Sequence, residues 1–311
     1  MSLVMTNAAG VAAPASASAA TDEGAGIGHP FPAPARVSGG MGGEIAVYDW
    51  GGDGPGCLLL HGTGDGAYVW HDFALEARKS WRVVGVDLFG HGDSDWSSSG
   101  DYSLESHVSQ IRGVATSLKL SGSVIMGHSL GGDIAARLAL QSPNEVRGLV
   151  LVDTGPDPSA EATQMVAEQL LARHRPYEAI EEYAAWLCET RMLARPEVLR
   201  RHAAQSLRLA ADGRFLLKCD PGLVRMLQMK HDDTWWFPAL RSLKAPTLVV
   251  RGQASAALSA ATAHRMASLL PNGRVTVVNG AGHAVMSDNP AGFSAAVLPF
   301  LDQLRRSVGQ P

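Results

Sequence analysis

The chain has 311 residues, of which 46% are hydrophobic and 18% charged, and its formal net charge at pH 7 is −4. This length and apolar content suffice for one large α/β domain with an insertion, or for two domains. Lysine and arginine form no long block, which argues against nucleic acid or an anionic membrane surface as a partner. No stretch approaches the ~20 apolar residues that a membrane span requires. A small uncharged ligand fits this composition better.

Residues 1–40 are rich in Ala, Gly, Ser and Pro and lack hydrophobic periodicity, which predicts a disordered tail. A signal peptide is the alternative, because the Ala-Ser run at 15–20 is similar to a cleavage site, but no positively charged segment precedes it. The chain has three cysteines without a disulfide or zinc pattern. We therefore expect a soluble cytoplasmic protein with free thiols and with no metal or cofactor, and a homodimer stays open.

From residue 44 onward, apolar runs alternate with helical patterns, which predicts an α/β fold with a mostly parallel central sheet and helices on both faces. The predicted strands are Glu44–Trp50, Cys57–His61, Arg82–Asp87, Val124–Met126, Gly148–Asp153, Thr247–Arg251 and Val275–Val278. The predicted core helices are Leu104–Leu118, Leu130–Leu140, Ala261–Leu270 and Pro290–Val308.

The alternation stops between Asp153 and Ala245, where the pattern indicates consecutive helices. The predicted helices of this interval are Glu161–His174, Ala179–Thr190 and Pro196–Ala211. We expect residues 156–239 to form a helical cap between two halves of the core, 41–155 and 240–311. An insertion between two core strands is expected to lie over the strand ends as a lid.

Ligands of open α/β sheets bind at the carboxyl ends of the strands, so the residues after each strand are the candidates for a site. The first long strand leads into His61-Gly62-Thr63-Gly64, where a turn could direct the Thr63 N–H at a developing oxyanion. The alternative is a glycine-rich loop with a solvated histidine. The segment Asp87 to Ser94 favours a shaped turn beside this loop, with Phe89 lining the pocket.

The run Val124 to Gly132 passes from an apolar strand through Gly-His-Ser-Leu-Gly into a helix. This context predicts a nucleophile elbow with Ser129 at the strand-to-helix joint, because glycines on either side leave room for a sharp turn. The helix start presents the Leu130 N–H as a second oxyanion donor. Near the C-terminus, His283 follows the last strand on a glycine-rich loop, where a histidine can act as general base.

These four segments, in this order, resemble the α/β-hydrolase fold superfamily over residues 44 to about 308, and most closely its capped serine esterases and C–C bond hydrolases. The resemblance implies Ser129 as the nucleophile, His283 as the base, and Thr63 and Leu130 as oxyanion donors. Related dehalogenases and epoxide hydrolases carry aspartate at the elbow, so Ser129 speaks against both activities.

The carboxylate that orients the histidine in this family usually lies in the loop after the strand equivalent to Thr247–Arg251, but here residues 252–259 contain no Asp or Glu. Some hydrolases of the fold take the acid from the next strand after the elbow, which implies Asp153. The alternatives are that Asp153 only forms a turn, that Asp157 is the acid, or that Ser255 or a water holds the histidine less well.

The expected pocket residues are His61, Phe89, His128, Trp235 and Trp236. Aromatic side chains in the insertion suit an apolar pocket, although most of them must pack the lid. The expected substrate is a small hydrophobic ester, thioester or lactone, cleaved through an acyl-enzyme. The alternatives are a C–C bond hydrolase and a non-catalytic ligand-binding protein that has lost the acid.

Overall fold

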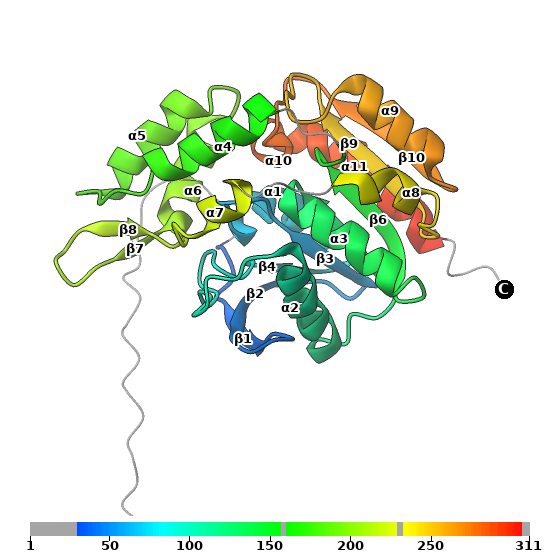
Figure 1. The fold of residues 1–311 in the computed structure, drawn as a ribbon, viewed down its shortest axis with the longest axis horizontal. Coiled ribbons are helices and arrows are strands. Elements are labelled where there is room, and N and C mark those ends of the chain that lie inside the picture. The colour runs from blue at the N-terminus through cyan, green and yellow to red at the C-terminus, as the bar shows by residue number, and fades with distance from the viewer. Residues whose placement is uncertain (1–29, 157–159, 229–232, 307–311) are drawn as a thin grey trace, which may run out of the picture. The chain divides into compact units, whose positions relative to one another are not determined.

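The computed structural model describes residues 30–156, 160–228 and 233–306 (Figure 1). The chain divides into two compact units, Met1–Pro30 and Phe31–Pro311, and the described helices and strands belong to the second. Most of the expected tail, residues 1–29, lies outside the described residues. Its last part does not match the expectation, because Ala35–Ser38 forms strand β1 and pairs antiparallel with β2. Regular structure therefore begins before residue 41.

An eight-stranded sheet forms the centre of the second unit, in the order β1-β2-β4-β3-β5-β6-β9-β10. Strands β1 and β2 are antiparallel to their neighbours, and the remaining strands run parallel. The bounds are β2 Glu44–Gly51, β3 Gly56–Leu60, β4 Arg82–Val86, β5 Ser123–His128, β6 Val146–Val152, β9 Thr247–Gly252 and β10 Gly273–Val278. Every residue of β5 is buried, as expected of a parallel strand covered on both faces.

Helices cover both faces of the sheet (Figure 1). One face packs on α2 (Leu104–Ser117), α3 (Leu130–Gln141) and α9 (Ala260–Leu269), and the other on α1 (His71–Ala77) and α11 (Pro290–Arg306). Two of these helices begin at capping serines, Ser103 and Ser259, whose hydroxyls accept hydrogen bonds from the backbone N–H three residues ahead. The predicted fold class is confirmed.

The segment between β6 and β9 holds most of the helices and strands that do not belong to the central sheet or to the helices that cover it. Its bounds are α4 Ala160–Ala172, α5 Ile180–Thr190, α6 Pro196–Ser206, β7 Leu207–Leu209, β8 Phe215–Leu217, α7 Leu223–Gln228, the 3₁₀ turn Asp233–Trp235 and α8 Trp236–Leu240. Buried residues of α5, α6 and the β7–β8 hairpin form an apolar cluster of their own around Tyr177, Tyr183 and Leu199. This cluster is what lets the segment hold a defined shape beside the sheet.

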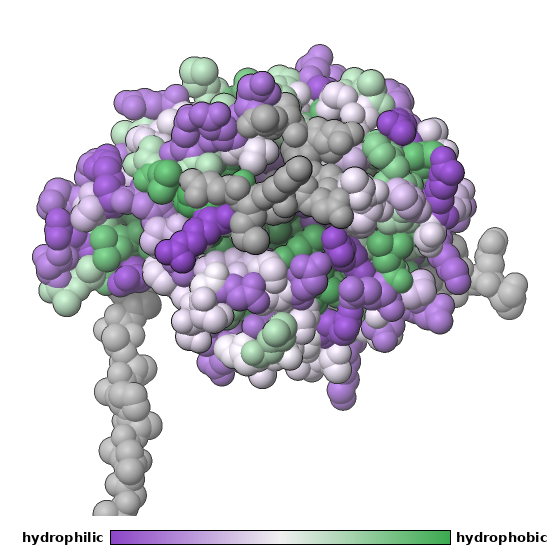
Figure 2. Space-filling view, viewed as in Figure 1, coloured by the Kyte–Doolittle hydropathy of each residue, from purple (hydrophilic) through white to green (hydrophobic). Residues whose placement is uncertain are grey.

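The predicted helix Pro196–Ala211 is wrong at its end. The helix stops at Ser206, and the following residues enter the antiparallel β7–β8 pair. Strands of three residues are too short for periodicity to reveal them. On the face drawn in Figure 2, hydrophobic residues lie in separate groups among hydrophilic ones rather than in one continuous patch. In the described part of the chain, no helix is long and apolar enough to cross a membrane.

Candidate active site

Ser129 lies at a strained turn between β5 and α3. Its backbone has φ 50° and ψ −121°, a conformation that costs about 1–3 kcal/mol for a non-glycine residue. A Cβ on Gly127 would come within 2.0 Å of the Gly131 carbonyl oxygen, and one on Gly131 within 2.3 Å of the Leu60 carbonyl oxygen. Only glycine fits either place, so the sequence enforces the sharp elbow that raises the Ser129 hydroxyl above the sheet.

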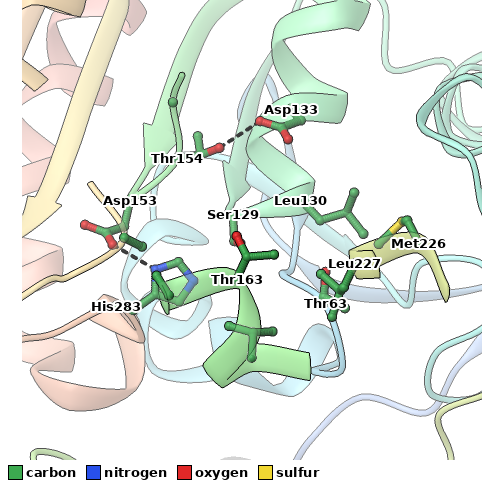
Figure 3. A pocket seen from close by; sticks show the side chains of 14 residues that line it. Thr63, Ser129, Leu130, Asp133, Asp153, Thr154, Thr163, Met226, Leu227 and His283 are labelled. Carbon is green, nitrogen blue, oxygen red and sulfur yellow. Dashed lines mark hydrogen bonds and ion pairs between the residues drawn. The ribbon is translucent and has the colours of Figure 1, made fainter. Parts of the chain in front are cut away.

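Asp153 follows β6 directly, and its carboxylate contacts His283. The Nδ1–H of His283 donates to Asp153 Oδ2 at 2.8 Å. The Asp153 side chain is fully buried, whereas 31% of the His283 side chain is exposed. Because Nδ1 carries the proton in this bond, Nε2 of His283 is left as the basic nitrogen. Figure 3 shows the His283 ring between Asp153 and Ser129.

The loop after β9, which lacks a carboxylate, still contributes to this contact. The Ser255 hydroxyl donates to Asp153 Oδ2, and the Gly252 N–H donates to Asp153 Oδ1 at 3.1 Å. Three hydrogen bonds from polar donors therefore satisfy a buried carboxylate that would otherwise be costly. Ser255 contacts Asp153 rather than the histidine, so the structure differs from the alternative in which Ser255 holds His283 alone. Asp157 lies outside the described residues.

The expected oxyanion donors border the same space as Ser129. Thr63 and Leu130 both line a cavity of ≈ 140 Å³ together with Ser129 and His283 (Figure 3). As the first residue of α3, Leu130 has a backbone N–H without an intrahelical acceptor. His91, which no sequence pattern singled out, fixes the Thr63 loop, because its Nε2 accepts a hydrogen bond from the Gly64 N–H at 2.9 Å.

Two expected pocket residues, His61 and Phe89, line neither of the two cavities described at Ser129. His61 is fully buried, where Nδ1–H donates to the Gly62 carbonyl and Nε2 accepts from the Leu88 N–H, each at 2.8 Å. Burial lowers the pKa of His61, which keeps the ring neutral in this role. Phe89 is also buried and packs on Tyr102 with 5.8 Å between ring centroids.

His128 does border the site. Its Nε2–H donates to the backbone carbonyl of His283 at 2.8 Å, and the two rings lie 4.6 Å apart. Burial, together with the neighbouring His283, lowers the pKa of His128 to about 4. His128 is therefore neutral at pH 7, and it tethers the loop that carries the candidate base.

The structure places Trp235 and Trp236 elsewhere. The two rings stack on each other, with centroids 4.5 Å apart, and the Arg137 guanidinium of α3 lies 4.3 Å from the Trp235 ring centroid. Trp236 is 1% exposed and belongs to the apolar core cluster. Neither residue lines the two described cavities that Ser129 borders. Both pack on the apolar core cluster instead.

A second, larger cavity of ≈ 500 Å³ meets the first at Thr63, Ser129, Val166 and His283. Its wall includes charged side chains that the sequence patterns did not single out: Asp65, Arg173, Arg191 and Asp288. Among the described residues, no three His, Cys, Asp or Glu side chains are grouped so that they could hold a metal ion.

Residues 58–290 match the α/β-hydrolase fold family. An esterase of Mycobacterium tuberculosis is 29% identical over 292 residues, covering 90% of this chain and 93% of the relative. The 2-(acetamidomethylene)succinate hydrolase of Mesorhizobium japonicum is 27% identical over 251 residues, covering 81% and 89%. A solved structure of an enzyme with this activity has a TM-score of 0.78 at 27% identity, over 86% of this chain and 98% of that one. The chain therefore belongs to the α/β-hydrolase fold family.

Proposed function

We propose that this protein is a serine hydrolase that cleaves a small ester, thioester or lactone through an acyl-enzyme on Ser129. The observation that carries the proposal is the 2.8 Å hydrogen bond from His283 to the buried Asp153 carboxylate, on the border of the cavity that Ser129 also lines. The two relatives, an esterase and a 2-(acetamidomethylene)succinate hydrolase, are both hydrolases, which supports a hydrolytic reaction.

In the proposed first step, Nε2 of His283 accepts the Ser129 hydroxyl proton while Oγ bonds to the substrate carbonyl carbon. The negative charge on the carbonyl oxygen is stabilised by the N–H groups of Thr63 and Leu130. Collapse of this intermediate breaks the bond to the leaving group, which takes the proton from His283. Asp153 fixes the ring tautomer and stabilises the transient imidazolium.

In the second step, His283 accepts a proton from water, and the resulting hydroxide bonds to the acyl carbon. The bond to Ser129 Oγ then breaks, and Oγ regains the proton from His283. This returns the serine and the histidine to their starting states and releases an acid. The tether from His128 to the His283 carbonyl, at 2.8 Å, supports the view that the base is held in one place through both steps.

The test is covalent labelling with a fluorophosphonate, which reacts with activated serines, followed by hydrolysis of a panel of aryl esters. We expect one label per chain and measurable turnover in the wild type, and neither in Ser129→Ala. Labelling that persists in Ser129→Ala would contradict the assignment of the nucleophile. Tight ligand binding without labelling or turnover in the wild type would favour the non-catalytic alternative instead.

A further inference from the structure

Two arginines, Arg191 and Arg173, line the larger cavity at Ser129, and they differ in whether a carboxylate pairs with them. Arg191, the residue after α5, has 20% of its side chain exposed, and its guanidinium lies 2.8 Å from the Asp65 carboxylate. Burial alone would raise the pKa of Asp65, but Arg191 and Arg173 offset this and hold it well below its ordinary value. Asp65 therefore carries a full negative charge at pH 7 and is matched by Arg191.

Arg173 is the second arginine, and its guanidinium has no such partner. It follows α4 and is only 5% exposed, yet it lines the cavity. Within the described part of the chain, Nε has no hydrogen-bond acceptor, and no ion pair of its side chain occurs. A buried arginine remains protonated and is costly to leave unpaired. Such a cation in a cavity at the candidate nucleophile points to an anion that arrives with the ligand.

The position of Arg173 relates it to the oxyanion loop. A Cβ built on Gly64 would lie 1.7 Å from Nη2 of Arg173, so the guanidinium rests directly against the residue next to Thr63. Gly64 has φ +76° and no side chain, and this allows the close approach. A group bound by Arg173 would therefore lie close to the Thr63 loop.

Asp288 is the other carboxylate on the wall of this cavity, at the end of α10 (Val285–Asp288). Its Oδ2 accepts a hydrogen bond from the Gly282 N–H at 2.8 Å, and burial raises its pKa. It lies within electrostatic reach of Arg191. Asp288 is thus engaged with the His283 loop and does not neutralise Arg173.

The two cavities also differ in character. The smaller one is lined by the apolar side chains of Ala162, Met226 and Leu227 and by the carboxylates of Asp133 and Asp153, and its described lining residues include no arginine or lysine. The larger one leads to Arg173. A substrate that spans both from Ser129 would place an apolar part in the first and an anionic part in the second.

We propose that Arg173 binds a carboxylate of the substrate, so that the natural substrate is an ester-type compound with a free carboxylate, as in the half-ester of a dicarboxylic acid. This rests on the proposed serine hydrolase activity and narrows its substrate class. The planar guanidinium matches a carboxylate with two parallel hydrogen bonds, which an ammonium group cannot do. The expectation of a wholly hydrophobic substrate is replaced by one with an apolar end and an anionic end.

The kinetic test compares 4-nitrophenyl hydrogen glutarate with its neutral methyl ester, each corrected for spontaneous hydrolysis. We expect the wild type to prefer the half-ester in kcat/KM and Arg173→Gln to lower that preference about ten- to hundredfold, the range for hydrogen bonds to a charged group. Arg208→Gln is the matched control, because Arg208 is an exposed arginine of β7, and it should keep the wild-type preference. A wild type that prefers the neutral diester, or an Arg173→Gln variant with unchanged preference, would overturn the proposal.

A binding measurement separates this proposal from the hydrolase itself. In Ser129→Ala, calorimetry should show at least tenfold tighter binding of monomethyl glutarate than of dimethyl glutarate, and a second substitution, Arg173→Gln, should abolish the difference. Selective binding without turnover in the wild type would contradict the hydrolase and leave the carboxylate site standing. Turnover without selective binding would contradict the carboxylate site and leave the hydrolase standing. If Arg173→Gln does not fold, the comparison of the two ligands in Ser129→Ala still tests the carboxylate preference, and equal binding of both ligands would overturn the proposal.

Discussion

Two residues with unusual backbone conformations make the candidate site. Ser129 and Asp153 both have positive φ, 50° and 48°, although neither is glycine. They follow the paired ends of two neighbouring parallel strands, where His128 is in register with Val152. The Ser129 N–H also donates to the Val152 carbonyl at 3.1 Å. Strain at both positions is typical of functional sites, and here it directs two polar side chains toward the same cavity.

The Asp153→Asn substitution tests the partner of the histidine. We expect kcat/KM on aryl esters to fall about 10³- to 10⁴-fold, because an amide favours the wrong imidazole tautomer and cannot stabilise the imidazolium. The protein should stay folded, since the amide oxygen can still accept from the Gly252 N–H and the Ser255 hydroxyl can turn to accept from the amide N–H. Asp302→Asn, a change on α11 away from the site, is the control and should retain activity. Full activity in Asp153→Asn would show that another group orients His283.

At the scale of elements, α3 is held against β3 by the absence of a side chain at Gly131. In an exposed helix, replacing glycine by alanine stabilises by about 1 kcal/mol. Here the added Cβ would meet the Leu60 carbonyl at 2.3 Å, a contact with backbone that cannot move aside freely. The steric cost of this contact therefore exceeds the gain in helix propensity, and the substitution should lower the free energy of unfolding.

We predict that Gly131→Ala destabilises the protein by about 2 kcal/mol or more, in line with overpacking of a filled core. Chemical denaturation monitored by circular dichroism gives the difference in unfolding free energy. The variant should also lose activity, because α3 would shift the Leu130 N–H. An increase in stability would mean that the helix is free to move away from β3.

The central strands could be predicted from the sequence, and other elements could not. Buried parallel strands such as β3 and β5 are nearly continuous apolar runs, which the sequence displays directly. Strand β1 is an exposed edge strand that pairs on one side only, so its residues carry no apolar pattern. The β7–β8 hairpin is too short for periodicity, and its position depends on packing within the inserted segment.

Some residues of the candidate site could likewise be predicted from the sequence, and others could not. Asp153 could be proposed because the resemblance to the α/β-hydrolase fold implies an acid at this strand end, and the register of β5 and β6 places it beside the end of β5. The charged residues Asp65, Arg173 and Arg191 could not, because their position around one cavity depends on how the inserted segment packs on the loop after β3, and nothing local encodes that packing. Trp235 and Trp236 failed as pocket residues because large apolar side chains serve core packing as readily as ligand binding.

At the scale of the whole molecule, several buried histidines link stability to pH. Burial lowers the pKa of His107 and of His128 to about 4 and that of His202 to about 3. His61 and His91 shift in the same direction. The unfolded chain binds protons at these residues near pH 6.5, before the folded protein does. Their contribution to stability is therefore complete above pH 6.5 and is lost as the pH falls from 6.5 toward 4.

His107 on α2 offers a direct test, because both of its ring nitrogens are buried without a hydrogen-bond partner in the described part of the chain. One such histidine costs the folded state about 2 kcal/mol at pH 5 relative to neutral pH. We predict that His107→Phe flattens the fall in Tm between pH 7 and pH 5, measured by calorimetry. An equal fall in wild type and variant would show that His107 titrates normally in the fold.

The central claim is that Ser129 forms a covalent acyl intermediate. The most direct measurement is rapid acid quenching during turnover of an aryl ester, followed by intact-mass analysis and peptide mapping. We predict a species heavier by one acyl group, located on Ser129, which is present in the wild type and absent in Ser129→Ala. Turnover by the wild type without any acylated protein, or turnover retained in Ser129→Ala, would contradict the account.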